Sequence, residues 1–304
     1  MGTHAGAGVL LGLLTAVFIG LFMVPRRYFR GDTLTFLVGM TFGAMVGNAV
    51  YWLLAGRPFQ CTWHACVALL PGANWAVGTY AYAAGTQRVG LSKATGIKNT
   101  QVVVTTLGAF LIFGEQATTQ PHLAFLGAAL VVATAFVLSR TEHRSEALPD
   151  ASLAGYLIPI IAGVLYGVNG LVMKWLISAG VARPQLNLGI GVGAFLGGAG
   201  LYAVVNGSFR GALAPGARQT ALAALGGLIW AAGLVTMIVS IAWAGVAVAW
   251  SLLNLSIVVS VLYGVFVFRE IDARRRWLQL AAGLSLACLG VSSLYLSRVV
   301  GGGG

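Results

Sequence analysis

Apolar residues fill most of the chain in stretches of about 20 residues, and short polar connections separate these stretches. A helix needs roughly 20 mainly apolar residues to cross the hydrocarbon core of a bilayer, so each stretch is long enough to span a membrane. The pattern therefore predicts an all-α integral membrane protein with ten transmembrane helices. The predicted spans are 5–24, 34–55, 63–84, 90–113, 122–139, 154–179, 185–205, 221–243, 245–268 and 277–297.

The composition supports the same class of protein. Hydrophobic residues make up 58% of the chain and charged residues 8%, whereas a typical soluble domain has about 25% charged residues. Mean hydropathy is +0.88, which excludes a soluble globular protein of this size. The first apolar run begins close to Met1 without a basic segment before it. We therefore interpret this run as the first membrane helix and not as a cleavable signal peptide.

Basic residues are distributed unevenly and account for the formal net charge of +11. The connections after odd-numbered helices hold Arg26, Arg27, Arg30, Arg88, Lys93, Arg140, Arg144, Arg210, Arg218, Arg269, Arg274, Arg275 and Arg276. The termini and the other connections hold only Arg57, Arg183 and Arg298. Because basic residues concentrate in cytoplasmic connections, we expect a multi-pass plasma (inner) membrane protein with both termini outside the cytoplasm. Membrane lipid is the expected partner of the basic residues, and no long basic domain with interleaved aromatic residues indicates a nucleic-acid partner.

The two halves of the sequence resemble each other. A shift that places residue 72 on residue 227 aligns 72–115 with 227–270 without a gap. The matched residues are Gly72/Gly227, Trp75/Trp230, Ala76/Ala231, Gly78/Gly233, Gly90/Gly245, Ala94/Ala249, Asn99/Asn254, Val103/Val258, Val104/Val259, Leu107/Leu262, Phe113/Phe268 and Glu115/Glu270. Shared apolar composition would not readily align tryptophan, asparagine and glutamate together.

This repeat divides the chain into two five-helix halves, residues 1–147 and 148–304. Because five is an odd number, the second half is expected to be inverted relative to the first. Inverted repeats with a binding site near the midplane at their interface are typical of secondary transporters. Glycines at helix-contact spacing agree with close packing of these helices, namely Gly39, Gly43 and Gly47 together with Gly189, Gly193 and Gly197.

Several segments resemble a known family of carriers. The segment "GANWAVGTYAYAAGTQRVGLSKATGI" (72–97) is similar to the third and fourth helices of the glucose/ribose-type and rhamnose permeases, which belong to the drug/metabolite transporter superfamily. The segment "GLFMVPRRY" (20–28) resembles the end of their first helix, and "FGE" (113–115) and "FRE" (268–270) look like the ends of helices four and nine. The resemblance implies a ten-helix fold of two inverted halves. It also implies a central cavity lined by helices one to four and six to nine.

Polar residues inside the predicted spans are candidates for the site, since polar groups in hydrocarbon are costly and usually face the interior of a bundle. They are Asn48, Asn74, Trp75, Lys98, Asn99, Gln101, Asn169, Lys174, Trp230, Trp250, Ser251 and Asn254. All seven acidic residues fall at predicted helix ends or in connections. The missing embedded carboxylate disfavours an exporter of cations. Three possibilities remain: the substrate is neutral, the substrate is anionic, or transport is coupled through a group other than a buried acid.

Lys98 and Lys174 each have two interpretations. A lysine at either position can snorkel to the membrane surface or form a structural pair. Alternatively, its ammonium faces the cavity, where it binds sugar hydroxyls or pairs with a carboxylate or phosphate. A buried lysine also changes its protonation state readily, so we hypothesise that Lys98 carries a coupling proton.

The remaining candidates are amides and indoles. Asn99 and Asn254 match in the repeat, and amides can both donate to and accept from substrate hydroxyls, although amides also bind helices together. Trp75, Trp230 and Trp250 offer flat faces that suit the C–H surface of sugars, and packing is the alternative. Asn74 and Asn169 rank lower. We expect Glu115 and Glu270 to be helix-end or gating residues that pair with loop arginines.

We predict from these residues a secondary-active or facilitative carrier that moves a small polar metabolite, first of all a sugar, by alternating access. The alternatives are a carrier of an anionic metabolite, such as a sugar phosphate or organic acid, and another carrier of the superfamily, such as an amino-acid or metabolite exporter. A proton or sodium ion is the candidate coupling ion. A homodimer through helices five and ten is also open.

No motif in the sequence indicates an enzyme. There is no His-Glu metal motif, no Gly-x-Asp pair and no nucleophile with a base. Cys61, His64 and Cys66 faintly resemble a metal site but lack the second ligand pair that structural zinc requires. We therefore expect neither a metal nor a cofactor.

Overall fold

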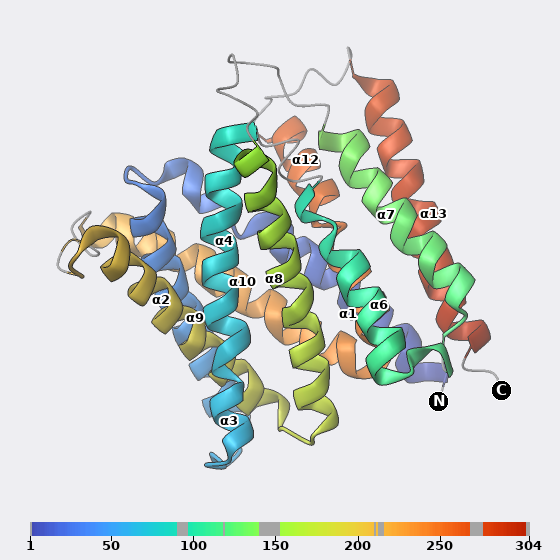
Figure 1. Ribbon diagram of the computed structural model, residues 1–304, viewed down its shortest axis with the longest axis horizontal. Coiled ribbons are helices and arrows are strands. Elements are labelled where there is room, and N and C mark those ends of the chain that lie inside the picture. Colours follow the sequence, from blue (N-terminus) through green and yellow to red (C-terminus); the bar gives the residue numbers. More distant parts are fainter. Residues whose placement is uncertain are drawn as a thin grey trace.

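The computed structural model describes residues 2–89, 97–117, 119–139, 153–209, 211, 216–267 and 276–301, and every regular element in these ranges is a helix (Figure 1). The first half contains α1 (Gly2–Leu21), the 3₁₀ helix η1 (Val24–Tyr28), α2 (Thr33–Leu54), α3 (Trp63–Val67), α4 (Leu69–Val89), α6 (Gln101–Phe113), the 3₁₀ helix η2 (Glu115–Ala117) and α7 (Pro121–Ser139). The second half contains α8 (Leu153–Ser178), α9 (Arg183–Asn206), α10 (Ala217–Ala244), α11 (Val246–Leu253), α12 (Ser256–Phe266) and α13 (Trp277–Gly301).

Seven helical segments in the described part of the chain are long and apolar enough to cross a membrane, which makes this a multi-pass membrane protein. These segments correspond to α1, α2, α7, α8, α9, α10 and α13. Each remaining predicted span also has a helical counterpart. α4 is long enough but carries more polar residues, while α6 and α11 are short. The three exceptions are therefore more polar or interrupted helices, and the site described below includes residues from all three.

Two predicted spans were wrong as single helices. The span 63–84 is the short α3 followed by α4, and the span 245–268 is divided into α11 and α12. The second division occurs because Asn254 N–H donates to Ser251 O and Val258 N–H donates to Leu255 O, at 3.2 and 2.9 Å. Such i to i+3 hydrogen bonds tighten a helix locally and interrupt its regular ladder.

The same interruption occurs at the start of α6. Val102 N–H donates to Asn99 O at 3.1 Å, and Val103 N–H donates to Thr100 O at 2.9 Å. Asn99 is the residue that matches Asn254 in the sequence repeat, so the two interruptions fall at corresponding positions. Both lie in the middle of predicted spans, where they place polar backbone and amide groups inside the protein.

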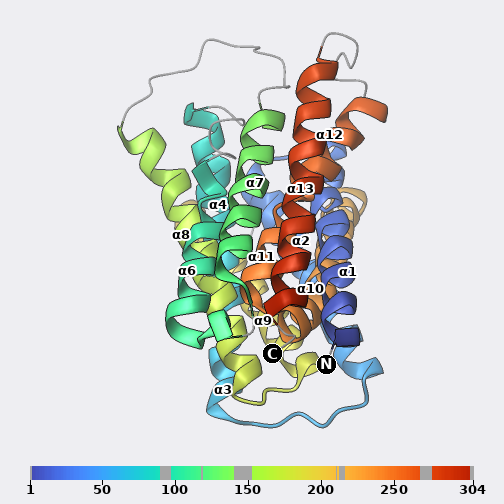
Figure 2. The same cartoon turned by 90° about the vertical axis from the view of Figure 1, so that its right-hand side faces the viewer.

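The helices form a bundle in which elements of the two halves interleave. α2 packs against α9 and α10, α4 packs against α8 and α9, and α1 packs against α10, α11 and α12. α7 and α13 pack against each other and lie side by side in both views, at one edge of the bundle in Figure 1 and facing the viewer in Figure 2. The core between the halves is built from residues of α2, α4, α8, α9, α10 and α11.

Two glycines that match in the repeat lie at very close helix contacts. A Cβ atom on Gly72 of α4 would overlap the carbonyl oxygen of Ile190 on α9. A Cβ atom on Gly227 of α10 would overlap the carbonyl oxygen of Met40 on α2 in the same way. Backbones this close require glycine, because any side chain would force the helices apart.

Gly227→Ala is expected to destabilise the protein by about 1–3 kcal/mol, because the added methyl group overpacks the contact between α10 and α2. Melting temperature in detergent measures the effect. Gly200→Ala is the matched control, since Gly200 is helical and exposed, and a Cβ atom there would meet no atom within 4 Å. Its melting temperature should stay the same or rise slightly, because alanine favours the helix. Equal melting temperatures for Gly227→Ala and the unchanged protein would contradict the close packing.

Candidate functional site

Trp75 of α4 and Trp230 of α10 stack on each other at the centre of the bundle. Their ring centroids are 4.2 Å apart and their planes differ by 29°. Both side chains are buried, with exposed fractions of 8% and 5%. The structure thus brings together two indoles that the repeat only aligned. In this conformation the stacked rings leave no room for a sugar between them.

Asn74 directly precedes Trp75 on α4. It contacts Asn169 of the facing helix α8. Asn74 Nδ2 donates to Asn169 Oδ1 at 2.7 Å and to Leu165 O at 2.8 Å. One turn along α8, the hydroxyl of Tyr166 lies 2.8 Å from the hydroxyl of Thr79. The sequence singled out neither Tyr166 nor Thr79, although Thr79 follows Trp75 by one helical turn.

A second cluster of polar side chains lies where α6 contacts α11. Gln101 Nε2 donates to Asn254 Oδ1 at 2.6 Å, and Asn254 Nδ2 donates to Trp250 O at 2.7 Å. Asn254 of the second half therefore contacts Gln101 of the first half. Gln101 lies two residues beyond Asn99, the residue that matches Asn254 in the repeat.

Asn99 and Trp250 each keep a buried donor without a partner in the described structure. These donors are Asn99 Nδ2 and Trp250 Nε1, on side chains that are 2% and 4% exposed. An unsatisfied buried donor costs about 1–3 kcal/mol, so such groups usually have a use. Both donors can hydrogen-bond to a substrate oxygen that enters the site.

Lys98 lies among aromatic rings and not in an ion pair of the described residues. Its Nζ is 5.2 Å from the ring centroid of Tyr82 and 5.7 Å from that of Tyr166. A cation over an aromatic face is attracted by the ring quadrupole. Because Tyr166 belongs to the middle of α8, the ammonium faces the interior of the bundle. Residues 90–96, the first part of the predicted span that contains Lys98, lie outside the described residues.

Lys174 occupies a different place from Lys98. Its Nζ lies 3.2 Å from Glu115 Oε1, and the two side chains are 21% and 5% exposed. Glu115 begins the short 3₁₀ helix η2 between α6 and α7, and Lys174 of α8 is a cationic partner of its carboxylate. The sequence allowed Lys174 to be a substrate contact or a structural pair, and the structure shows the pair. Glu270 lies outside the described residues.

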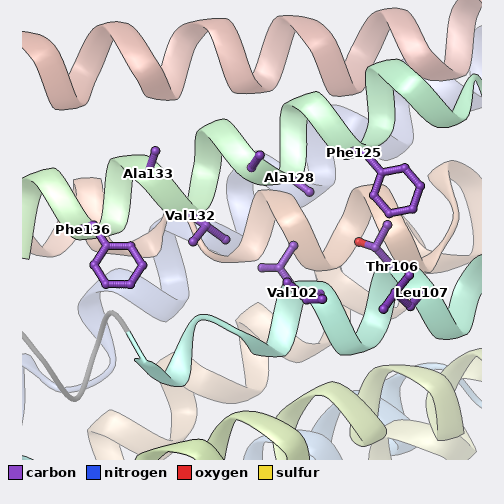
Figure 3. Close-up of a pocket in the computed structure, with 10 residues that line it drawn as sticks. Val102, Thr106, Leu107, Phe125, Ala128, Val132, Ala133 and Phe136 are labelled. Carbon is purple, nitrogen blue, oxygen red and sulfur yellow. The ribbon is translucent and has the colours of Figure 1, made fainter.

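A separate cavity of about 450 Å³ opens between α6 and α7 (Figure 3). Its lining is apolar except for Thr106, and it includes Val102, Leu107, Phe125 and Phe136. A sugar needs several hydrogen-bonding partners, which this lining does not supply. The cavity is therefore unsuited to a polar substrate, and the polar and aromatic groups between α4, α6, α8, α10 and α11 form the candidate site.

A polytopic helical fold with buried amides, indoles and a lysine at the contact between its halves defines the class of membrane transporters for small molecules. The model of the family described as sugar transport protein matches residues 10–297. The chain belongs to this family, and the protein is a membrane sugar transporter and not an enzyme.

Curated relatives and a solved structure agree with this assignment. The chain is 25% identical to a glucose uptake protein of Staphylococcus xylosus over 91% of its length and 94% of the relative. It is 27% identical to a putative sugar uptake protein of Listeria innocua, over 93% of this chain and 96% of the relative. It is also 27% identical to a glucose uptake protein of Bacillus subtilis, over 91% of this chain and 94% of the relative. One crystal structure shares the fold with a TM-score of 0.72 at 17% identity, over 97% of this chain and 99% of the other.

Proposed function

We propose that the protein takes up a neutral sugar of the glucose class by alternating access. The family match carries this proposal, and the relatives named for glucose uptake support it. The chemistry of the site also suits a neutral sugar. Indole faces pack against the apolar C–H surface of a sugar ring, while amides and indole N–H groups bind its hydroxyls.

The proposed architecture is two inverted halves, residues 1–147 and 148–304. The equivalent contacts of Gly72 and Gly227 and the corresponding interruptions at Asn99 and Asn254 support it. An inverted pair of halves can open alternately to either side around a fixed central site. We place the chain in the drug/metabolite transporter superfamily, near the glucose/ribose-type and rhamnose permeases, with both termini outside the cytoplasm.

We assign the site residues distinct roles. Trp75, Trp230 and Trp250 supply the aromatic surfaces, and the stacked pair separates to admit the sugar. Asn99 and the Trp250 indole supply free donors, while the hydrogen bonds of Asn74, Asn169 and Asn254 rearrange around the bound hydroxyls. These roles draw on the buried polar groups between α4, α8 and the α6–α11 contact.

Lys98 favours a second candidate substrate class, an anionic sugar derivative such as a sugar phosphate. Within the described structure its ammonium contacts two aromatic rings and no carboxylate. An unpaired interior cation can bind a phosphate or carboxylate directly. With a neutral sugar, the same ammonium donates hydrogen bonds to hydroxyls and carries the coupling proton. A coupling sodium ion and a homodimer are further proposals.

Uptake by the purified protein tests the proposed function. Proteoliposomes loaded with unlabelled glucose should accumulate labelled glucose by exchange, and the initial rate should saturate with concentration. Unlabelled glucose should compete, and glucose 6-phosphate should not. A rate that rises linearly with concentration, or that empty liposomes reproduce, would contradict transport of this sugar.

A further inference from the structure

A charged cluster joins three segments at the end of the bundle where both chain termini lie, which we call the termini face (Figure 2). Glu115, directly after α6, binds Lys174 of α8 through the 3.2 Å ion pair. The same carboxylate accepts hydrogen bonds from the backbone N–H groups of Val246 and Ala247, at 2.9 and 3.3 Å. These two residues form the first turn of α11. The cluster thus contains a carboxylate, an ammonium and a helix N-terminus.

The backbone around the carboxylate is shaped to hold it. Gly245 between α10 and α11 has φ of +83°, and a Cβ atom there would lie 2.8 Å from Glu115 Oε2. Glycine at this position therefore permits both the turn and the approach of the carboxylate. The positive end of the α11 dipole and the ammonium of Lys174 both stabilise the negative charge. A carboxylate that is buried to 5% exposure inside the protein is tolerable only with such partners.

We propose that Glu115, Lys174 and the N-terminus of α11 form a latch that closes the sugar path on the termini face. This inference rests on the proposed alternating access and names the contact that controls one side of it. Glu115 belongs to the first half, whereas Lys174 and α11 belong to the second. Any motion that separates α6 from α8 and α11 on this face breaks the cluster.

The position of the latch relative to the site supports this role. Asn169 precedes Lys174 by five residues on α8, which is about 7.5 Å along the helix axis. Trp250 follows Val246 by four residues on α11, about 6 Å along its axis. The cluster therefore lies beside the candidate site, on its termini-face side, on two of the helices that carry the site.

A charged latch also suits a contact that must open repeatedly. A buried ion pair gains little net stability, because its attraction is offset by the desolvation of both charges. When the path opens, entering water solvates the carboxylate and the ammonium, so the open state is not heavily penalised. Removing one partner is different, because the other charge then stays buried without its partner and the closed state is destabilised.

Thiol labelling tests the latch. In a chain whose three native cysteines are replaced by serine, Asn169→Cys reports access to the site. A membrane-impermeant thiol reagent is applied separately to each side of sealed vesicles. Glu115→Gln and Lys174→Met should each raise the labelling rate from the termini face about tenfold, by shifting the population toward the open state. Labelling from the opposite side should fall or stay the same.

Matched variants separate the latch from a loss of folding. Lys174→Arg keeps the cation and should label at the parent rate. Asp32→Asn removes another helix-capping carboxylate, which binds Thr35 within its own helix, and should also leave the rate unchanged. The double variant Glu115→Gln with Lys174→Met should label no faster than the faster single variant, since both changes release one contact.

Two results would overturn the proposal. The first is an unchanged labelling rate from the termini face in both single variants, which would make the cluster a static brace. The second is an equal rise from both sides, which would indicate general loosening. The labelling experiment uses no sugar, so a negative labelling result contradicts the latch and does not bear on sugar uptake. Conversely, side-specific labelling in a protein that does not transport glucose would support the latch and contradict only the proposed substrate.

Discussion

Trp230→Ala is expected to abolish measurable sugar exchange, reducing the initial rate on the order of 100-fold or more. Trp230 is 5% exposed and contributes one face of the indole stack at the contact between α4 and α10. Its removal deletes both the aromatic surface proposed for the sugar and the contact that orients Trp75. Central, desolvated tryptophans are the side chains whose truncation usually costs most in binding.

Controls distinguish lost binding from lost folding. Truncating a buried tryptophan also leaves a cavity that costs about 3–5 kcal/mol of stability, so melting temperature must be measured alongside transport. Trp230→Phe keeps an aromatic face and should retain an intermediate rate. Trp277→Ala removes an indole that is 61% exposed at the start of α13 and should transport at the parent rate. Normal exchange in a folded Trp230→Ala protein would contradict the assignment of the stack to the site.

Lys98→Met is expected to weaken glucose binding roughly 10- to 100-fold, because it removes a charged hydrogen-bond donor from the interior of the bundle. Methionine keeps most of the aliphatic length of the side chain but lacks the ammonium that lies over the rings of Tyr82 and Tyr166. The shift in melting temperature on adding glucose measures the loss, since a ligand that binds only the folded state stabilises it. Lys174→Met should retain the glucose-induced shift, because Lys174 is paired with Glu115 outside the site.

The pH dependence of uptake in Lys98→Met tests the coupling role separately. If Lys98 carries the coupling proton, the residual uptake in this variant no longer changes with pH. An unchanged pH profile in Lys98→Met would contradict that role while leaving the hydrogen-bonding role intact. An unchanged glucose affinity would contradict the placement of Lys98 in the site.

The helical segments could be predicted because hydrophobic length alone determines where a chain crosses a membrane. Each predicted span has a helix within it in the described structure, including α4, whose polar residues lower its hydropathy. The interruption at Asn254 could not be predicted. Its i to i+3 hydrogen bonds leave no glycine or proline signal, and they depend on packing around Gln101 and Trp250.

The site could be predicted as a set of residues but not as a set of contacts. Matching Trp75 with Trp230 identified both indoles, yet their stacking depends on how α4 and α10 are placed in space. The pairing of Glu115 with Lys174 was missed for a similar reason. The two residues are on different helices and in different halves, and no pattern along the chain sets the register between such helices.

Binding of a neutral sugar at the buried site between the two halves is the central claim. The most direct measurement is the melting temperature of the purified protein in detergent with glucose and, separately, with glucose 6-phosphate. We predict that glucose raises the melting temperature with a saturable concentration dependence and that glucose 6-phosphate does not. Stabilisation by the phosphate alone, lost in Lys98→Met, would contradict the claim and identify the site as one for anions.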